Sequence, residues 1–388
     1  MNTPTANPAV IVPAALKGVQ ASADSLTLQW ADGRTSQFAA IWLRDNQVEQ
    51  RDAHSGQRLV DIADSPAAPK IRAATLHADS VQVQWESEPH TAAFDVGWLA
   101  AQTDTPFEQV PMQAWIGGTL DAARDFAWLS LQQLSENAAD RSRWLSRLLI
   151  DGIVFLSEVP AAEGAILEAM SWVGRVAETN YGLVFDVRSV AQPENLAFSD
   201  LGLGLHTDNP YREPVPGFQA LHMLIASPDG GENLFADGLA LAAHLRHDDP
   251  DAFARLTSTA VPFRYRSKDA DLYAERPLIQ LSCEGAVTGV HYNNRSIAPL
   301  RLPLEDTQAF YGAYRKFALL LRDPKFQLKF RLRSGDLVLF DNQRILHGRT
   351  PFSSAKHARH LRGCYLTRDS VYSESALLRR QLHAVPSA

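Results

Sequence analysis

The sequence predicts a mainly β protein in two parts. A small β-rich domain is expected at residues 10–100, and a larger domain with a β-barrel or double-sheet core and flanking helices at residues 120–388. Apolar and polar residues alternate in the first hundred residues and again after residue 200, which is typical of strands with one buried face. Segments with helical spacing precede the later strands or lie between them, an order that favours helices packed outside a β core.

Two segments of the small domain resemble one another. "SLTLQWADGRTSQFAAIWL" (25–43) and "SVQVQWESEPHTAAFDVGWL" (80–99) each contain an alternating strand that ends in Trp, a polar turn, a second short strand and a Trp-Leu pair. This pattern predicts two related hairpins. The stretch 103–120 contains Pro and Gly with little periodicity and predicts a linker.

The elements of the larger domain follow from their periodicity. Helical spacing predicts helices at 141–152, 161–178 and 304–323, and apolar runs predict strands at 153–160, 218–226, 278–285, 286–294 and 335–349.

Composition narrows the class of function. The formal net charge is -7 and no basic tract is present, so a nucleic-acid or anionic-lipid partner is not expected. A small-molecule substrate is expected instead. Two cysteines, Cys283 and Cys364, are too few for a disulfide framework. The N-terminus has neither a signal-peptide pattern nor a membrane-spanning run, and a cytoplasmic location is expected.

The stretch "GLGLHTDNPYREP" raises the question of a metal site. His206 and Asp208 lie two residues apart, so on a strand they would share one face and could chelate one ion. His347, after the apolar strand of "GDLVLFDNQRILHGR", is the best third ligand. Two imidazoles and one carboxylate form the facial triad of non-haem Fe(II) oxygenases, in which other coordination positions stay open.

Arg359 lies twelve residues after His347 (359 minus 347), in "HARHLRGCYLTRD". If 2-oxoglutarate chelates the iron through its keto-acid end, a fixed arginine can bind the distal carboxylate with two parallel hydrogen bonds. The alternative is a solvated surface charge beside Lys356, His357 and His360.

The sequence resembles the γ-butyrobetaine hydroxylase group of Fe(II)/2-oxoglutarate dioxygenases over nearly its whole length. The resemblance is carried by "WADGRTSQFAAIWLRDN", "NYGLVFDVRS", "LHTDNP", "PGFQALH", "GGENLFADG", "FDNQRILHGR" and "RHLRGCY". It implies a double-stranded β-helix (jelly-roll) catalytic domain behind the small β-rich domain, a homodimer, and Fe(II), 2-oxoglutarate and O₂ as cofactor and cosubstrates, with ascorbate supportive. The implied iron ligands are His206, Asp208 and His347, and the implied cosubstrate residues are Arg359, Asn233 and Leu221.

The resemblance also implies a substrate with a trimethylammonium head. Such a group binds aromatic faces by cation–π attraction, and Tyr181, Phe185, Phe198 and Tyr365 occupy the matching positions. At the anionic end the sequence departs from the typical carnitine-forming enzyme: Asn209 stands where Tyr is common, and Arg295 follows Asn294, while Asn195 lies in the expected place. The extra donors favour slightly the three-oxygen anion of 2-(trimethylamino)ethylphosphonate over γ-butyrobetaine, whose hydroxylation makes L-carnitine.

Many relatives hold a structural zinc in the small domain, and this sequence departs from that pattern. Gln47, Glu49 and Asp52 occupy the thiolate positions and His90 stands alone at the fourth, so the domain is expected to fold without zinc. Two alternatives for the whole protein stay open: a zinc hydrolase on the same fold, in which Arg359 has no obvious role, and a non-catalytic betaine-binding protein.

Overall fold

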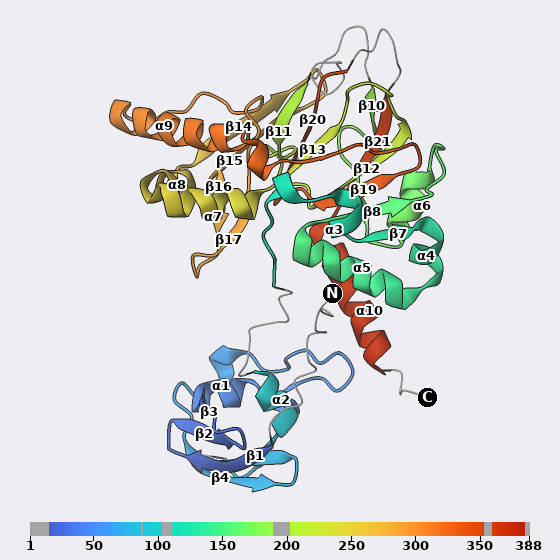
Figure 1. The fold of residues 1–388 in the computed structure, drawn as a ribbon. Coiled ribbons are helices and arrows are strands. Elements are labelled where there is room, and N and C mark those ends of the chain that lie inside the picture. The colour runs from blue at the N-terminus through green and yellow to red at the C-terminus, as the bar shows by residue number, and fades with distance from the viewer. Residues whose placement is uncertain (1–14, 87, 103–110, 189–201, 353–358, 385–388) are drawn as a thin grey trace. The chain divides into compact units, whose positions relative to one another are not determined.

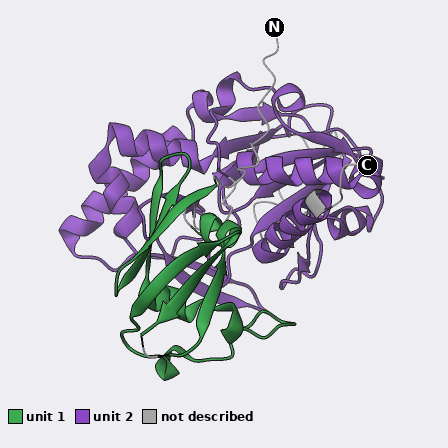
Figure 2. Cartoon of the chain, turned by 90° about the horizontal axis from the view of Figure 1, so that it is seen from below, with its two compact units in different colours: residues 1–109 green, residues 110–388 purple. Residues whose placement is uncertain are grey.

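The computed structural model describes residues 15–86, 88–102, 111–188, 202–352 and 359–384 (Figure 1). The chain divides into two compact units, residues 1–109 and 110–388 (Figure 2). Within the described ranges, no helix combines the length and the apolar character needed to cross a membrane.

Unit 1 contains two three-stranded antiparallel sheets, each followed by a short helix. The elements are β1 (Leu16–Ala21), β2 (Ser25–Trp30), β3 (Thr35–Ala39) and α1 (Ala40–Asp45), then β4 (Ile71–His77), β5 (Ser80–Trp85), β6 (Thr91–Asp95) and α2 (Val96–Ala101), with 3-10 turns at Val48–Gln50 and Ile62–Asp64. The two predicted hairpins correspond to β2–β3 and β5–β6. Each sheet has a further strand, β1 or β4, that the prediction missed because its residues are mostly half-buried and alternate weakly.

The core of unit 1 explains the similarity of its two segments. Alternate residues of β2 and β5 point inward and are buried, ending in Trp30 on one strand and Trp85 on the other. The tryptophans of the two helices, Trp42 and Trp98, stack on each other with ring centroids 5.5 Å apart. Burial of large aromatic rings supplies much of the stability of so small a unit.

Unit 2 is built on two β-sheets with a shared interior. The larger sheet has the order β10-β21-β12-β19-β8-β7, with β9 paired to β21, and the smaller sheet has the order β11-β20-β13-β18. The strands of the larger sheet are β7 (Trp128–Ser130), β8 (Ile153–Ser157), β9 (Val176–Ala177), β10 (Phe185–Arg188), β12 (Phe218–Ile225), β19 (Leu337–Asp341) and β21 (His360–Leu366). Those of the smaller sheet are β11 (Leu203–His206), β13 (Asn233–Asp237), β18 (Leu328–Phe330) and β20 (Ile345–Arg349).

Alternation along the strands divides the side chains between two cores. On β12, Leu221 and Met223 pack with Phe235 of β13 in the apolar cluster shared by the two sheets. Phe218 and Ala220 belong instead to the cluster on the outer face, which the helices cover. This double-sheet arrangement confirms the predicted jelly roll.

Helices cover the outer face of the larger sheet (Figure 1). They are α4 (Leu131–Glu136), α5 (Ala138–Asp151), α6 (Ala165–Ser171) and α10 (Arg368–Ala384). On α5, Trp144, Leu145 and Leu148 face the sheet at helical spacing, and Gly152 ends the helix in the left-handed conformation that favours glycine. The predicted helix at 161–178 is shorter than expected, because only α6 is helical and β9 follows it.

A long insertion between β13 and β18 forms a second apolar cluster. It contains α7 (Gly238–Asp248), α8 (Pro250–Ser258), β14 (Val261–Arg266), β15 (Asp271–Arg276), β16 (Ile279–Leu281), β17 (Val287–Val290) and α9 (Leu304–Leu320). A 3-10 turn at Pro324–Phe326 leads into β18. The predicted strands at 278–285 and 286–294 are therefore a short hairpin, β16–β17, and the predicted helix at 304–323 is α9.

The second half of the predicted linker is part of unit 2. It contains a 3-10 turn at Gly117–Thr119, and α3 (Ala122–Asp125) follows. The buried ion pair of Arg344 and Asp237 holds this stretch: the backbone N–H of Trp115 donates to Asp237 (3.1 Å) and Arg344 donates to the Gln113 carbonyl (2.6 Å). Lack of periodicity therefore did not mean lack of packing.

Candidate active site

His206 and His347 are brought together by strand pairing. They are direct partners in the antiparallel register of β11 and β20, and their ring centroids are 4.3 Å apart. Directly opposed side chains on one face of a sheet are close neighbours, which places the two imidazoles side by side.

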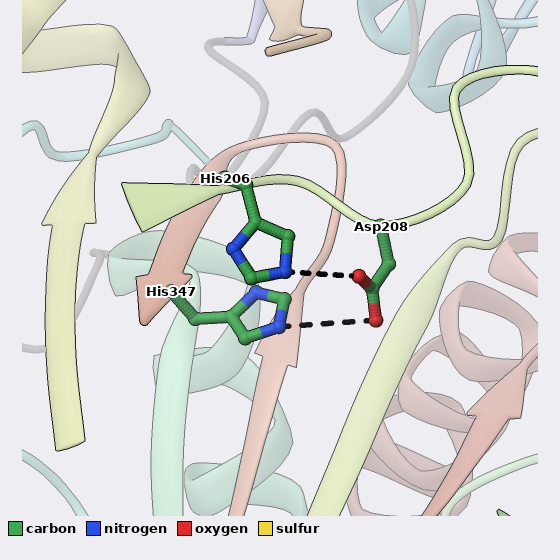
Figure 3. Close-up of side chains that lie close together, drawn as sticks. All are labelled: His206, Asp208 and His347. Atoms are coloured by element: carbon green, nitrogen blue, oxygen red, sulfur yellow. Dashed lines mark ion pairs between the residues drawn. The ribbon is translucent and has the colours of Figure 1, made fainter. Parts of the chain in front are cut away.

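Asp208 completes the cluster from the loop after β11 (Figure 3). Its carboxylate oxygens lie 3.2 Å from Nε2 of His206 and 3.8 Å from Nε2 of His347. One ligand atom from each residue lies within 4.8 Å of the others. The expectation that His206 and Asp208 share a strand face is wrong, since the strand ends at His206.

Asn342 fixes the position of Asp208 through two hydrogen bonds to its backbone. The Asn342 Nδ2 donates to the Asp208 carbonyl (3.0 Å), and its Oδ1 accepts from the Asp208 N–H (2.8 Å). The neighbouring Thr207 N–H donates to the Tyr292 carbonyl at 2.7 Å. These contacts hold the Asp208 carboxylate beside the two histidines, although Asp208 lies beyond the end of the strand.

The protonation states suit a divalent cation. Nδ1 of His206 lies 2.9 Å from the Gly204 carbonyl, and donation to that oxygen leaves Nε2 with its lone pair. Burial lowers the pKa of both histidines, that of His347 to about 3, so both imidazoles are neutral. Burial opposes ionisation of Asp208, but the positive charge that His347 and His206 carry when protonated, together with a hydrogen bond from the Tyr365 hydroxyl, holds the pKa of this carboxyl well below its usual value. Two neutral imidazoles and one carboxylate fit Fe(II) in a site with open positions.

A cavity opens beside the three residues. Its wall combines aromatic, cationic and amide side chains, a composition typical of small-molecule sites. The lining residues are Tyr181, Phe185, Val187, Leu203, His206, Asp208, Asn209, Gln219, Leu221, Asn233, Arg295, His347, Gly348, Arg349, Arg359, Leu361 and Tyr365.

Arg359, Asn233 and Leu221 all lie in this wall. The Arg359 guanidinium donates to Oδ1 of Asn233 and to the carbonyl of Gly231, both at 3.2 Å. Gly231 is in the left-handed conformation (φ +64°), and a Cβ there would lie 2.9 Å from Cδ of Arg359, so glycine leaves space for the arginine to pass.

Arg349 shares this part of the wall and was not predicted. It follows His347 by two residues on β20, and this spacing was the signal in the sequence. Burial and the charge of Arg349 lower the pKa of Arg359 to about 9. Two guanidinium groups in one buried wall favour a dianion such as 2-oxoglutarate.

Three of the four predicted aromatic residues line the cavity. The rings of Phe185 and Tyr365 are 5.1 Å apart, and those of Tyr181 and Phe185 are 6.4 Å apart. Phe198 and Asn195 lie outside the described residues.

Two of the residues predicted for the anionic end of the substrate, Asn209 and Arg295, line the cavity. Arg295 lines the cavity, and its charge contributes to lowering the pKa of His206 and of His347, whereas Asn294 is exposed and does not line the cavity as described. Asn209 is buried and bonded to two tyrosines, Tyr365 and Tyr211. Both polar ends of its amide thus have partners within the protein, and its anion-binding role stays a prediction. Gln219, Tyr211 and Asn342 are further residues of the site that the sequence reasoning missed.

In unit 1, the positions expected to have lost zinc ligands form a polar network. Arg44 donates to Oε1 of Gln47 at 2.7 Å and to Glu88 at 2.9 Å, and His90 lies 3.2 Å from the same carboxylate. Asp52 instead accepts hydrogen bonds from its own turn, at Ser55. The absence of zinc stays a prediction.

The jelly roll, the facial set of ligands and the cationic wall together define an Fe(II)- and 2-oxoglutarate-dependent dioxygenase. The chain belongs to the taurine catabolism dioxygenase TauD, TfdA family, whose model matches residues 115–365. A second model, gamma-butyrobetaine hydroxylase-like, N-terminal, matches residues 18–100. Membership in a dioxygenase family also decides against the zinc hydrolase and the non-catalytic binding protein.

Relatives match over most of their length. A gamma-butyrobetaine dioxygenase from Pseudomonas sp. (strain AK-1) is 34% identical over 371 residues, which cover 92% of this chain and 94% of that protein. The gamma-butyrobetaine dioxygenase of Homo sapiens is 27% identical over 374 residues (92% and 95%). The trimethyllysine dioxygenase of Meyerozyma guilliermondii is 24% identical over 380 residues (92% and 94%).

Proposed function

We propose that this protein hydroxylates γ-butyrobetaine, with 2-oxoglutarate and O₂ as cosubstrates, to give L-carnitine. The observation that carries the proposal is the 34% identity to a gamma-butyrobetaine dioxygenase over nearly both chains. The relatives are named for γ-butyrobetaine and trimethyllysine, and both compounds carry a trimethylammonium group. The comparisons therefore favour γ-butyrobetaine over the phosphonate that the sequence reasoning preferred.

The cavity has one surface suited to the trimethylammonium group of the substrate and another suited to the distal carboxylate of 2-oxoglutarate. Tyr181, Phe185 and Tyr365 present ring faces on which a quaternary ammonium can rest, since it has no hydrogen to donate. Arg359 and Asn233 form the fixed polar pair for the distal carboxylate of 2-oxoglutarate. Bound iron supplies the oxidising chemistry, in which 2-oxoglutarate becomes succinate and CO₂ and one oxygen atom of O₂ enters the substrate as hydroxyl. The work of the protein is to orient the substrate and to exclude water.

A screen of trimethylammonium compounds tests this proposal. Purified protein with Fe(II), ascorbate, 2-oxoglutarate and O₂ is given γ-butyrobetaine, trimethyllysine or 2-(trimethylamino)ethylphosphonate, and succinate and hydroxylated product are measured. We expect γ-butyrobetaine to have the highest kcat/KM. Succinate formation that no trimethylammonium compound stimulates would overturn the proposal.

The phosphonate remains a second candidate because of Arg295. Its charge faces the cavity near the iron ligands, and a phosphonate with more oxygen acceptors than a carboxylate makes fuller use of a guanidinium. Under the main proposal, Arg295→Ala lowers kcat/KM for γ-butyrobetaine and leaves it the best substrate. If wild type prefers the phosphonate and Arg295→Ala removes that preference, the second candidate replaces the first.

A further inference from the structure

A chain of hydrogen bonds runs from the iron ligand Asp208 into the protein. The Tyr365 hydroxyl donates to Oδ2 of Asp208 at 2.8 Å, and Nδ2 of Asn209 donates to the Tyr365 hydroxyl at 3.1 Å. The Tyr211 hydroxyl then donates to Oδ1 of Asn209 at 2.6 Å. Tyr365, Asn209 and Tyr211 are each less than one-tenth exposed, so water does not compete for these bonds.

Ring packing continues this chain to the wall of the cavity. Tyr181 lines the cavity on its aromatic side and packs edge-on against Tyr265 with ring centroids 6.1 Å apart, while Tyr211 is not among the lining residues. The ring of Tyr211 is held from behind by Tyr265, stacked at 5.2 Å and 18°. The four residues Tyr181, Tyr211, Asn209 and Tyr365, called the relay below, thus connect the aromatic wall to the carboxylate.

The backbone at Asn209 is suited to this use of its side chain. Asn209 has a φ of 54°, in the left-handed region that asparagine tolerates better than most residues. This conformation turns the backbone directly after Asp208. The side-chain amide of Asn209 then bonds at both polar ends, to Tyr365 through its nitrogen and to Tyr211 through its oxygen.

The hydrogen bond to Asp208 has a consequence for metal binding. A carboxylate with Oδ2 engaged by a hydroxyl is restrained from rotating, and Oδ1, next to His206, would be available to an ion held by these residues. Partners that orient metal ligands in this way contribute about 10–100-fold to metal affinity or activity.

We propose that the relay positions the Asp208 carboxylate for iron and couples its position to occupancy of the aromatic wall. Tyr365 and Asn209 then act as positioning residues, and Tyr211 acts on the iron site although it lines no part of the cavity. The positioning role rests only on the dioxygenase site, whereas the coupling rests on the proposed trimethylammonium substrate.

Metal affinity without substrate tests the positioning role. Mn(II) and Fe(II) are titrated into protein purified free of metal, with and without 2-oxoglutarate, using the Mn(II) electron paramagnetic resonance signal and the absorption of the Fe(II)–2-oxoglutarate complex. We expect Tyr365→Phe to weaken metal binding by about tenfold or more, and Tyr211→Phe to weaken it by a smaller factor and to shift the absorption band. Wild-type affinity and spectrum in both variants would overturn the proposal.

A matched control separates the relay from general loss of a buried hydroxyl. Tyr314→Phe removes the hydroxyl of a half-buried tyrosine that lies outside the relay and whose ring packs against Tyr292 with centroids 5.6 Å apart, and this variant is expected to bind metal like wild type. If Tyr365→Phe fails to fold, as judged by thermal unfolding of the metal-free protein, Tyr211→Phe and Asn209→Asp carry the test. An aspartate at 209 tolerates the same backbone but competes with Asp208 for the Tyr365 hydroxyl.

The coupling has its own readout. γ-Butyrobetaine added to the wild-type Fe(II)–2-oxoglutarate complex is expected to change its absorption, and Tyr211→Phe is expected to lose this change while still binding the substrate. The variant should also form more succinate per hydroxylated product than wild type. An unchanged ratio and an unchanged spectral response in Tyr211→Phe would refute the coupling, as would a wild type that hydroxylates γ-butyrobetaine without any spectral response. A wild type that neither responds to γ-butyrobetaine nor hydroxylates it would refute the proposed substrate but leave the metal-affinity result standing.

Discussion

Gly363 lies beneath the aromatic wall, and its replacement by alanine tests the wall directly. Gly363 and Phe185 are register partners on β21 and β10, and a Cβ on Gly363 would lie 2.4 Å from Cζ and 2.5 Å from Cε2 of the Phe185 ring. Carbon atoms pack at about 3.5–4.0 Å. The ring must therefore move by about 1 Å or more, away from its place beside Tyr365.

Displacement of the ring removes one face from the wall. A desolvated cation–π contact is worth on the order of 1–2 kcal/mol, which corresponds to a ~5–30-fold lower kcat/KM for γ-butyrobetaine. An analogue with a neutral tert-butyl head has nearly the same shape and should lose much less. Steady-state kinetics on both compounds measure the difference.

A control variant accounts for the general effect of adding a methyl group. Gly312 on α9 has nothing within 4 Å of the site of its Cβ, so Gly312→Ala should leave kinetics unchanged and stabilise the helix slightly. If Gly363→Ala keeps wild-type kcat/KM, or lowers it equally for the charged and neutral heads, then Phe185 makes no cation–π contact with the substrate.

Three further predictions concern other parts of the molecule. Arg359→Lys keeps the charge but not the fork, and loss of a charge-assisted hydrogen bond of about 1.5–3 kcal/mol should raise the KM for 2-oxoglutarate at least tenfold; an unchanged KM would argue against the clamp. Arg44→Ala leaves the partly buried Glu88 without its cation and should lower the free energy of unfolding of unit 1 by about 1–3 kcal/mol, as measured by urea denaturation, whereas a loss within error would mean that the network is dispensable. Burial and two nearby arginines lower the pKa of His291 to about 3, so between that value and 6.5 the unfolded state binds a proton that the folded state does not, and stability falls as pH falls. The metal-free protein should thus lose about 2 kcal/mol more between pH 7 and pH 5 than His291→Gln does, and parallel pH profiles would contradict this.

The sequence alone was enough to predict those parts of the protein in which a local pattern of residue types reflects burial or ligand chemistry. Strands β2 and β5 were predictable because alternate residues are buried and each strand ends in a buried tryptophan. The set His206, Asp208, His347 and Arg359 was a strong hypothesis because a chelating site and an anion site require particular residue types in an order that chance seldom produces. Strand β1 has no such pattern and was missed.

Tertiary structure decided which side chains the site uses and how. The sequence left Arg359 open as either a cosubstrate clamp or a surface charge, and the structure places it in the cavity wall just before β21. Asn342 reaches Asp208 across 134 residues of sequence, and the bond from Asn209 to Tyr365 spans 156. Contacts between residues so far apart leave no period in the sequence, because they depend on strand register and on loops whose paths are set only when the two sheets pack together.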